Sequence, residues 1–276
     1  MTDPAQQASD LLWECWTQER RIDALPDAIR PRTRPEGYAI QQRLERRSSS
    51  PLFGWKIAAT SKAGQAHIAV DGPLAGRLLR ERVFEPGAEV PFGANHMRVA
   101  EAEFAFRMGR DLAPRQRSYQ VDEVLAAVAT LHPAIEIPDS RFDDFTLVGA
   151  VQLIADNACA HYFVLGPETT ADWRSLDLVE HPVTATVRPD GGGGPSRPPD
   201  AAGTSVPVHG KGGNVLGDPR IALTWLANEL SSLGLTLRAG EVVTTGTCIT
   251  PPAIAPGDRF EADFGALGRI DVRLGA

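Results

Sequence analysis

The alternation of residues 99–107 constrains the fold of this chain more than any other stretch. Alanine and phenylalanine residues occupy every second position, and Glu101 and Glu103 lie between them. Successive side chains of a β-strand point to opposite faces, so the pattern predicts a strand with both acids on one face. Taken alone, such a pair is typical of the solvated face of an edge strand.

Glu136 argues against a purely solvated face, because it interrupts the apolar run 134–137, where an unpaired carboxylate is costly. Two like charges on one strand face repel, and burial raises the pKa of at least one of them unless a cation or solvent lies between them. A third carboxylate from the next strand favours a cation, and oxygen ligands suit Mg²⁺ or Mn²⁺. The sequence therefore predicts a hard-metal site at Glu101, Glu103 and Glu136.

Apolar periodicity predicts helices before Pro51: one carries Leu12 and Trp16, and a second, after a Pro-rich break, carries Tyr38. From Phe53 onward the pattern changes to short strands and turns. Further helices are predicted over 121–131 and 148–160, and Pro133 is expected to end the first of them before the strand that carries Glu136.

Two glycine-rich stretches interrupt the second half. Residues 188–204 contain four consecutive glycines and four prolines, a composition that predicts a flexible hairpin insertion. The stretch 210–214 is interpreted as a tight turn in preference to an anion cradle. A helix follows it, with Asp218 as its N-cap and Gly234 as its terminator. Alternation then predicts strands at 241–245, 259–263 and 269–274.

Composition excludes several classes of protein. The net charge of -7 and the pI near 5.4 argue against a nucleic-acid or anionic-membrane surface. Cys15, Cys159 and Cys248 form neither a disulfide framework nor a zinc motif, which favours a reducing cytoplasm. No signal peptide or membrane-spanning run is recognisable, so we expect a cytoplasmic protein.

Beyond the three acids, several ordered segments between Phe53 and the carboxyl terminus resemble the fumarylacetoacetate hydrolase superfamily, in its 2-keto-4-pentenoate hydratase and 2-oxo-3-enedioate decarboxylase branch. The matching segments are Gly54-Trp55-Lys56, Thr60-Ser61-Lys62, Val99-Ala100-Glu101-Ala102-Glu103, Glu136-Ile137-Pro138-Asp139-Ser140-Arg141, Ala155-Asp156-Asn157-Ala158, Val215-Leu216-Gly217-Asp218-Pro219, Trp225-Leu226-Ala227-Asn228, Leu237-Arg238-Ala239-Gly240-Glu241, Thr245-Gly246-Thr247 and Pro256-Gly257-Asp258. The helical first section, with Tyr38 and Gln41, is similar to the cap of the hydratase branch.

The resemblance implies an α+β fold, with a mixed β-sheet roll or sandwich core and a helical N-terminal cap. We expect residues 1–80 to hold the cap and first strands, and residues 81–276 to form the β-rich catalytic core. It also implies a homo-oligomer.

The resemblance further implies a 2-oxo acid bound to Mg²⁺ or Mn²⁺ on Glu101, Glu103 and Glu136. Lys56 is the implied acid/base group, with a salt bridge to Glu101 or Asp139 as its alternative role. The expected substrate contacts come from four side chains. These are Asn157, Thr247, His161 and Arg141. Local backbone capping by the Asn and Thr, core packing by the His and a structural pair between the Arg and Asp139 are the alternatives.

Two departures from the hydratase pattern bear on the reaction. Leu74 stands where the hydratases carry an acid after the turn 71–73, and residues 158–162 are bulkier than the small residues usual there. The main prediction is hydration of a 2-hydroxy-2,4-dienoate such as 2-hydroxypenta-2,4-dienoate to a 4-hydroxy-2-oxo acid. Decarboxylation of a 2-oxo-3-enedioate, hydrolytic C–C cleavage of an acylpyruvate and a silent partner subunit that binds 2-oxo acids are the alternatives.

Overall fold

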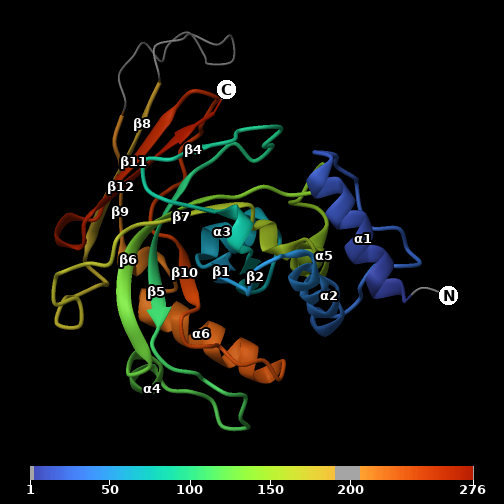
Figure 1. The fold of residues 1–276 in the computed structure, drawn as a ribbon, viewed down its shortest axis with the longest axis horizontal. Coiled ribbons are helices and arrows are strands. Elements are labelled where there is room, and N and C mark those ends of the chain that lie inside the picture. Colours follow the sequence, from blue (N-terminus) through green and yellow to red (C-terminus); the bar gives the residue numbers. More distant parts are fainter. Residues whose placement is uncertain (1–2, 190–205, 276) are drawn as a thin grey trace.

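The computed structural model describes residues 3–189 and 206–275, and within them the chain forms two β-sheets with helices beside them (Figure 1). This is the predicted α+β architecture. The predicted glycine-rich insertion at 188–204 lies almost entirely outside the described residues.

The larger sheet has the strand order β2-β1-β10-β5-β6-β7-β3. Its strands are β1 (Gly54–Ala58), β2 (Leu74–Leu78), β3 (Val83–Phe84), β5 (Glu101–Met108), β6 (Val128–Ile137), β7 (Tyr162–Leu165) and β10 (Val242–Thr247). Strand β1 runs parallel to β10, whereas β5 lies antiparallel between β10 and β6. The first two strands thus join the same sheet as the later ones, and the predicted division near residue 80 stays a prediction.

The smaller sheet has the order β4-β12-β11-β8-β9 and is formed by the second half of the chain together with one early strand. Its strands are β4 (Glu89–Val90), β8 (Pro182–Arg188), β9 (Val208–Lys211), β11 (Arg259–Asp263) and β12 (Arg269–Leu274). Residues alternate between buried and solvated along β8, β11 and β12, which gives this sheet one apolar face and one charged face.

The α-helices are α1 (Pro4–Thr17), α2 (Arg34–Gln41), α3 (Lys62–His67), α4 (Val121–Leu125), α5 (Gly149–Ala155) and α6 (Pro219–Ser232). Helix α6 begins after the N-cap Asp218, whose side chain accepts from the Arg220 amide, and Gly234 follows its end with φ +72°. Short 3₁₀ turns occur at 42–47, 80–82, 157–159, 212–214 and 265–267.

The helices predicted at 121–131 and 148–160 extend further than the helices in the structure. Helix α4 ends at Leu125, and β6 begins at Val128, because residues 128–137 pair with β5 and this long-range pairing outweighs the helical periodicity. Pro133 lies within β6, opposite Phe104. Helix α5 ends at Ala155, followed by residues with positive φ rather than further helix.

The N-terminal helices are tied to the sheet by polar contacts. The Tyr38 hydroxyl on α2 donates to Glu229 of α6 at 2.8 Å and accepts from the Ala75 amide of β2 at 3.2 Å. The Gln41 side-chain amide donates to the carbonyls of Ala75 and Ile154, each at 2.8 Å. The cap therefore positions the start of β2, the strand that carries Leu74.

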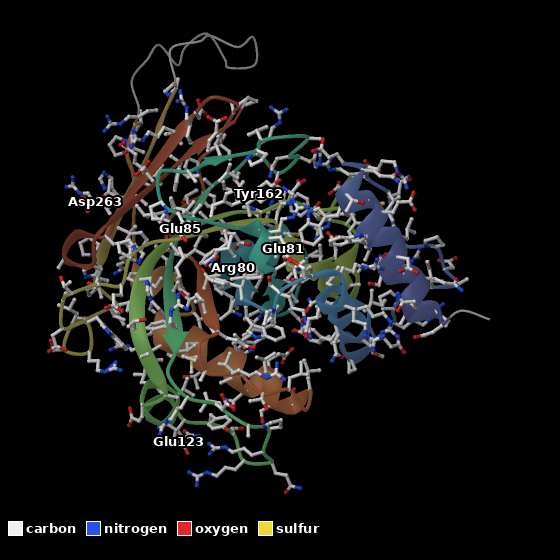
Figure 2. The ribbon with its side chains drawn as sticks, viewed as in Figure 1. Arg80, Glu81, Glu85, Glu123, Tyr162 and Asp263 are labelled. Carbon is white, nitrogen blue, oxygen red and sulfur yellow. The ribbon has the colours of Figure 1, made fainter. Side chains whose placement is uncertain are left out.

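Charged side chains cover the outside of the fold, and the core is apolar. Asp263 on β11 lies on the left flank of the molecule and Glu123 on α4 at its lower edge (Figure 2). The main cluster of buried apolar side chains links the two sheets through residues such as Phe104, Phe260 and Phe264. None of the described helices combines the length and apolar composition that crossing a bilayer requires.

Candidate metal centre and cavity

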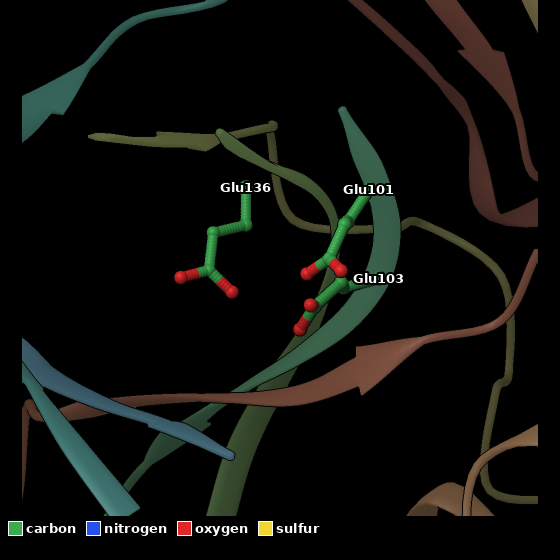
Figure 3. Close-up of side chains that lie close together, drawn as sticks. All are labelled: Glu101, Glu103 and Glu136. Atoms are coloured by element: carbon green, nitrogen blue, oxygen red, sulfur yellow. The ribbon is translucent and has the colours of Figure 1, made fainter. Parts of the chain in front are cut away.

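Three carboxylates meet where β5 and β6 pair. Glu101 lies directly opposite Glu136 in the antiparallel register, and Glu103 follows two residues along β5 on the same face. One oxygen from each of the three acids lies within 4.8 Å of the others. Figure 3 shows the three side chains extending into the same space beside β5. The predicted juxtaposition of these acids is thus present in the structure.

The local chemistry fits a divalent cation. Glu103 and Glu136 are fully buried, and neither Glu103 Oε1 nor Glu136 Oε2 accepts a hydrogen bond from any described residue. Burial, reinforced by the charges of Glu136 and Glu101, holds the pKa of Glu103 well above its ordinary value. Burial also raises the pKa values of Glu101 and Glu136. Orphaned buried oxygens and mutually repelling carboxyls are what a bound cation would relieve.

The second oxygen of Glu103 is fixed by β10. Glu103 Oε2 accepts from the Thr244 hydroxyl and, at 2.7 Å, from the Gly246 amide. Gly246 has φ +95°, and a Cβ there would lie 2.0 Å from Thr60 Oγ1, so only glycine fits. These donors hold one face of the carboxylate and leave Oε1 available as a ligand.

Lys56 of β1 is buried beside these acids. Its Nζ lies 2.9 Å from Glu136 Oε1 and donates to the Ala158 carbonyl at 3.0 Å. Burial alone would lower the pKa of Lys56, but the negative charges of Glu136 and Glu101 outweigh burial and raise it above the ordinary value. The expected salt bridge is therefore made to Glu136, and not to Glu101 or Asp139.

The backbone that contacts Lys56 is strained. Asn157, Ala158 and Cys159 have φ values of +57°, +51° and +61°, a run that is unfavourable for side chains other than glycine. The Asn157 side chain accepts from the Arg77 amide at 2.7 Å and donates to the Arg77 carbonyl at 2.9 Å. A Cβ at Gly76 would lie 2.4 Å from the Asn157 carbonyl, so glycine permits this close approach. The two hydrogen bonds between Asn157 and the Arg77 backbone, called the Asn157 clamp below, hold the Ala158 carbonyl against Lys56.

A cavity of about 560 Å³ opens beside the three carboxylates. Lys56, Glu101 and Thr247 contribute to its wall. The Thr247 hydroxyl donates to the Ile249 carbonyl at 3.1 Å and accepts from the Ile249 amide at 3.4 Å, so one lone pair of its oxygen is left to accept. Leu74, the residue in place of the expected acid, also lines this cavity and is fully buried.

Comparison of the sequence with known proteins assigns the chain to a family. The family model described as fumarylacetoacetate (FAA) hydrolase C-terminal matches residues 78–274. The chain belongs to the fumarylacetoacetate hydrolase family. It is 34% identical over 268 residues to 2-keto-4-pentenoate hydratase of Paraburkholderia xenovorans, covering 96% of this chain and 93% of the relative. It is 32% identical to 2-hydroxyhexa-2,4-dienoate hydratase of Comamonas testosteroni, covering 95% and 94%.

The fold of this fumarylacetoacetate hydrolase family member also matches a solved structure. The 4-oxalocrotonate decarboxylase of Pseudomonas putida G7, complexed with magnesium and adipate, superposes with a TM-score of 0.82 at 23% identity, covering 98% of this chain and 97% of that one. At that identity the likeness establishes the fold alone. The predicted family and fold class are thereby confirmed.

Three of the residues predicted to bind substrate do not line the 560 Å³ cavity: Asn157, Arg141 and His161. Asn157 makes the backbone clamp described above. The Arg141 guanidinium is buried against the Asp156 carboxylate, and His161 Nδ1 accepts from the Trp16 indole at 2.8 Å. Each of these three side chains thus has a structural partner in the protein. A contact of any of the three with substrate stays a prediction.

The expected side-chain pair between Asp139 and Arg141 is not formed. The Asp139 carboxylate pairs with Arg21 at 2.8 Å, whereas Arg141 reaches Asp139 through its backbone carbonyl, at 2.8 Å, and pairs with the Asp156 carboxylate. Sequence reasoning missed the Arg21 and Asp156 partners, because both come from segments distant in sequence from their partners. The pattern of the positive-φ turn at 157–159 was also missed, although its Asn at the first position is a residue that tolerates this conformation.

Proposed function

We propose that this protein is a divalent-metal-dependent hydratase that adds water to a 2-hydroxy-2,4-dienoate and gives a 4-hydroxy-2-oxo acid. The observation that carries the proposal is the cluster of Glu101, Glu103 and Glu136 beside a buried lysine at the wall of a cavity. The hydratase names of relatives that match over nearly the whole chain support it.

Glu101, Glu103 and Glu136 would hold Mg²⁺ or Mn²⁺, the cations that favour carboxylate ligands. When bound, the cation supplies Lewis acidity that stabilises negative charge on the carboxylate and 2-oxygen of a 2-oxo acid. By holding the cation at one wall of the cavity, the three carboxylates would determine where the acid end of the substrate binds. Thr247, with its hydroxyl already donating to Ile249, can accept a hydrogen bond there.

Lys56 would move the proton that the reaction requires. Ketonisation of the dienol takes a proton from the 2-hydroxyl and adds one at carbon, and addition of water at C4 then adds a further proton at C3. Glu136 and the Ala158 carbonyl hold Nζ in one place and keep it charged, so Lys56 is poised to donate first. The amine left after donation at C5 can accept the 2-hydroxyl proton, and the ammonium group so regenerated can then donate at C3 and accept the proton that the attacking water releases.

The second candidate is decarboxylation of a 2-oxo-3-enedioate, a reaction that adds no water. Leu74 bears on it only through the acid that it replaces, and it provides no partner for the second carboxylate of an enedioate. This buried leucine lines the cavity where the hydratases carry an acid, so an acid expected to orient water is missing from this wall. Lys56 and the three carboxylates serve both reactions equally well. A homo-oligomer in the cytoplasm remains part of the proposal, and the three buried, unpaired cysteines suit a reducing compartment.

The deciding experiment follows the ultraviolet absorbance of enzymatically generated 2-hydroxypenta-2,4-dienoate with purified protein in Mg²⁺, Mn²⁺ or EDTA, with products identified by NMR. Metal-dependent loss of the dienol with formation of 4-hydroxy-2-oxopentanoate supports hydration. Absence of that product, together with release of carbon dioxide from 2-oxo-3-enedioate, refutes hydration and favours decarboxylation.

A further inference from the structure

The cavity is larger than a five-carbon acid requires. At roughly 30 Å³ for each non-hydrogen atom, the share of one water in the liquid, a volume of about 560 Å³ holds about twice the atoms of 2-hydroxypenta-2,4-dienoate. That excess remains substantial after a cation and its waters are allowed for. The structure therefore has room for a substituent beyond the dienoate.

The space beyond the carboxylates has an apolar wall. Leu74, Leu153 and Phe145 line it from β2, α5 and the segment before α5, and Ile68 joins them after α3. Leu74 and Leu153 are fully buried, so their positions are fixed by packing. The Phe145 ring stands edge-on to His67, with centroids 6.0 Å apart. A hydrocarbon group placed here would lose water contact without leaving a polar group unpaired.

The same wall offers little to a second carboxylate. Among the described residues that line the cavity there is no arginine, and the one lysine, Lys56, is already paired with Glu136; the remaining nitrogen base is His67, whose ring packs against Phe145. Other polar side chains that line the cavity, such as Asn214 and Ser61, are neutral: the Asn214 amide donates one N–H to the Cys248 carbonyl, and the Ser61 hydroxyl accepts from the Gly64 amide at the start of α3 and keeps its own O–H as a donor. A distal carboxylate would be desolvated next to Leu74 with no guanidinium or unpaired ammonium group in the cavity wall, which is costly.

We propose that this site selects 2-hydroxydienoates whose distal end is an alkyl or aryl group, discriminates against those with a distal carboxylate, and uses Leu74 as a determinant of that choice. The inference rests on the proposed function for the dienoate end of the substrate. The preference for an apolar distal group is inferred separately, from the apolar wall of the cavity.

Binding of unreactive 2-oxo acids tests the selection without turnover. The purified full chain with saturating Mg²⁺ is titrated calorimetrically with 2-oxopentanoate, 2-oxooctanoate and 2-oxoadipate. We expect 2-oxooctanoate to bind at least tenfold more tightly than either of the others, because it alone buries extra methylene groups at no charge cost. Equal affinities, tightest binding of 2-oxoadipate or no binding of any of the three overturns the proposal.

Leu74 and Leu78 provide a matched pair of variants. Both are buried leucines on β2, but Leu78 packs in a separate apolar cluster with Phe163 and Val242 and does not line the cavity. Leu74→Ala should reduce the preference for 2-oxooctanoate over 2-oxopentanoate at least threefold, and Leu78→Ala should leave it within twofold. Leu74→Met, which conserves volume and apolarity, should retain it. Equal effects of the two alanine variants contradict the role of Leu74.

Turnover separates failure of this inference from failure of the proposed function. A protein that prefers 2-oxooctanoate but converts no 2-hydroxydienoate refutes the proposed function and supports the selection. A protein that hydrates 2-hydroxypenta-2,4-dienoate but binds 2-oxoadipate most tightly retains the function and refutes the selection.

Discussion

Lys56 Nζ lies 2.9 Å from Glu136 Oε1, and both side chains are almost fully buried. A buried charge pair gains little net stability over an apolar pair, but removal of one partner leaves the other uncompensated. Glu101 and Glu103 add further negative charge within the same cluster. Lys56 therefore balances part of this negative charge in the metal-free protein, and a bound cation would balance more.

Replacement of Lys56 by methionine should separate its chemical role from its electrostatic one. We expect Lys56→Met to lower kcat by about 10²–10⁴-fold at saturating Mg²⁺, the usual contribution of a positioned acid/base. In EDTA the free energy of unfolding should fall by about 3–5 kcal/mol, because Glu136 loses its buried partner. Steady-state kinetics and urea unfolding measure the two effects, and unchanged turnover would refute the acid/base role.

Glu103→Gln should have opposite effects with and without metal. The amide keeps the shape of the side chain but removes a buried charge next to Glu101 and Glu136, so the melting temperature in EDTA should rise by a few degrees. Affinity for Mn²⁺, followed by electron paramagnetic resonance, should fall at least tenfold because a charged ligand is lost. The exposed Glu123, which pairs with Arg115 on the surface, supplies the control: Glu123→Gln should leave metal affinity unchanged.

Asn157 should act as a positioning residue, through the Ala158 carbonyl that contacts Lys56. Asn157→Ala removes both hydrogen bonds to the Arg77 backbone and should destabilise the fold by about 2–4 kcal/mol, since buried partners are left unsatisfied. The freed turn should also lower kcat more than tenfold with little change in KM.

Asn228 is the matched control for this clamp. Its side chain accepts from the Tyr119 amide at 2.7 Å and donates to the Tyr119 carbonyl at 3.1 Å, but neither residue lines the cavity. Asn228→Ala should therefore lose stability and retain kcat at permissive temperature. If both variants lost activity in proportion to stability alone, Asn157 would have only a structural role.

Local patterns predicted the parts of the fold that depend on nearby residues. The α6 caps at Asp218 and Gly234 follow from side-chain chemistry and positive φ, and alternation placed β11 and β12 correctly. Residues 121–131 were misassigned because their helical period competes with pairing between β6 and β5, a contact that no local window contains. The same limit applies to Pro133, which local rules predict at a helix end and which instead lies within β6, opposite Phe104.

The candidate site was predictable to a similar degree. Glu101 and Glu103 share a strand face by periodicity alone, and the position of Glu136 in an apolar run marked it as unusual. The pairing of Lys56 with Glu136 and the hydrogen bonds between Asn157 and the Arg77 backbone could not be predicted from the sequence. Both depend on how separate segments approach one another. Side chains such as Arg141 can meet a substrate or a buried acid, and the sequence does not distinguish these cases.

We expect His161 to lower the free energy of unfolding in mild acid. Burial, followed by the charges of Arg141, Arg82 and Arg21, holds the pKa of this histidine well below its ordinary value, and Nδ1 accepts a hydrogen bond from Trp16 that the protonated ring could not accept. Below about pH 6.5 the unfolded chain therefore binds a proton that the folded chain does not, so the free energy of unfolding falls by up to about 1.4 kcal/mol per pH unit. Urea unfolding between pH 7.5 and 5.5 measures the net slope, to which the raised pKa values of the three clustered glutamates contribute in the opposite sense. The difference between the protein and a His161 variant therefore isolates the histidine. His161→Gln, whose carbonyl can still accept from Trp16, should remove the histidine contribution to the slope, whereas His209→Gln on the exposed strand β9 should not. An unchanged slope in His161→Gln would assign the acid sensitivity to other groups.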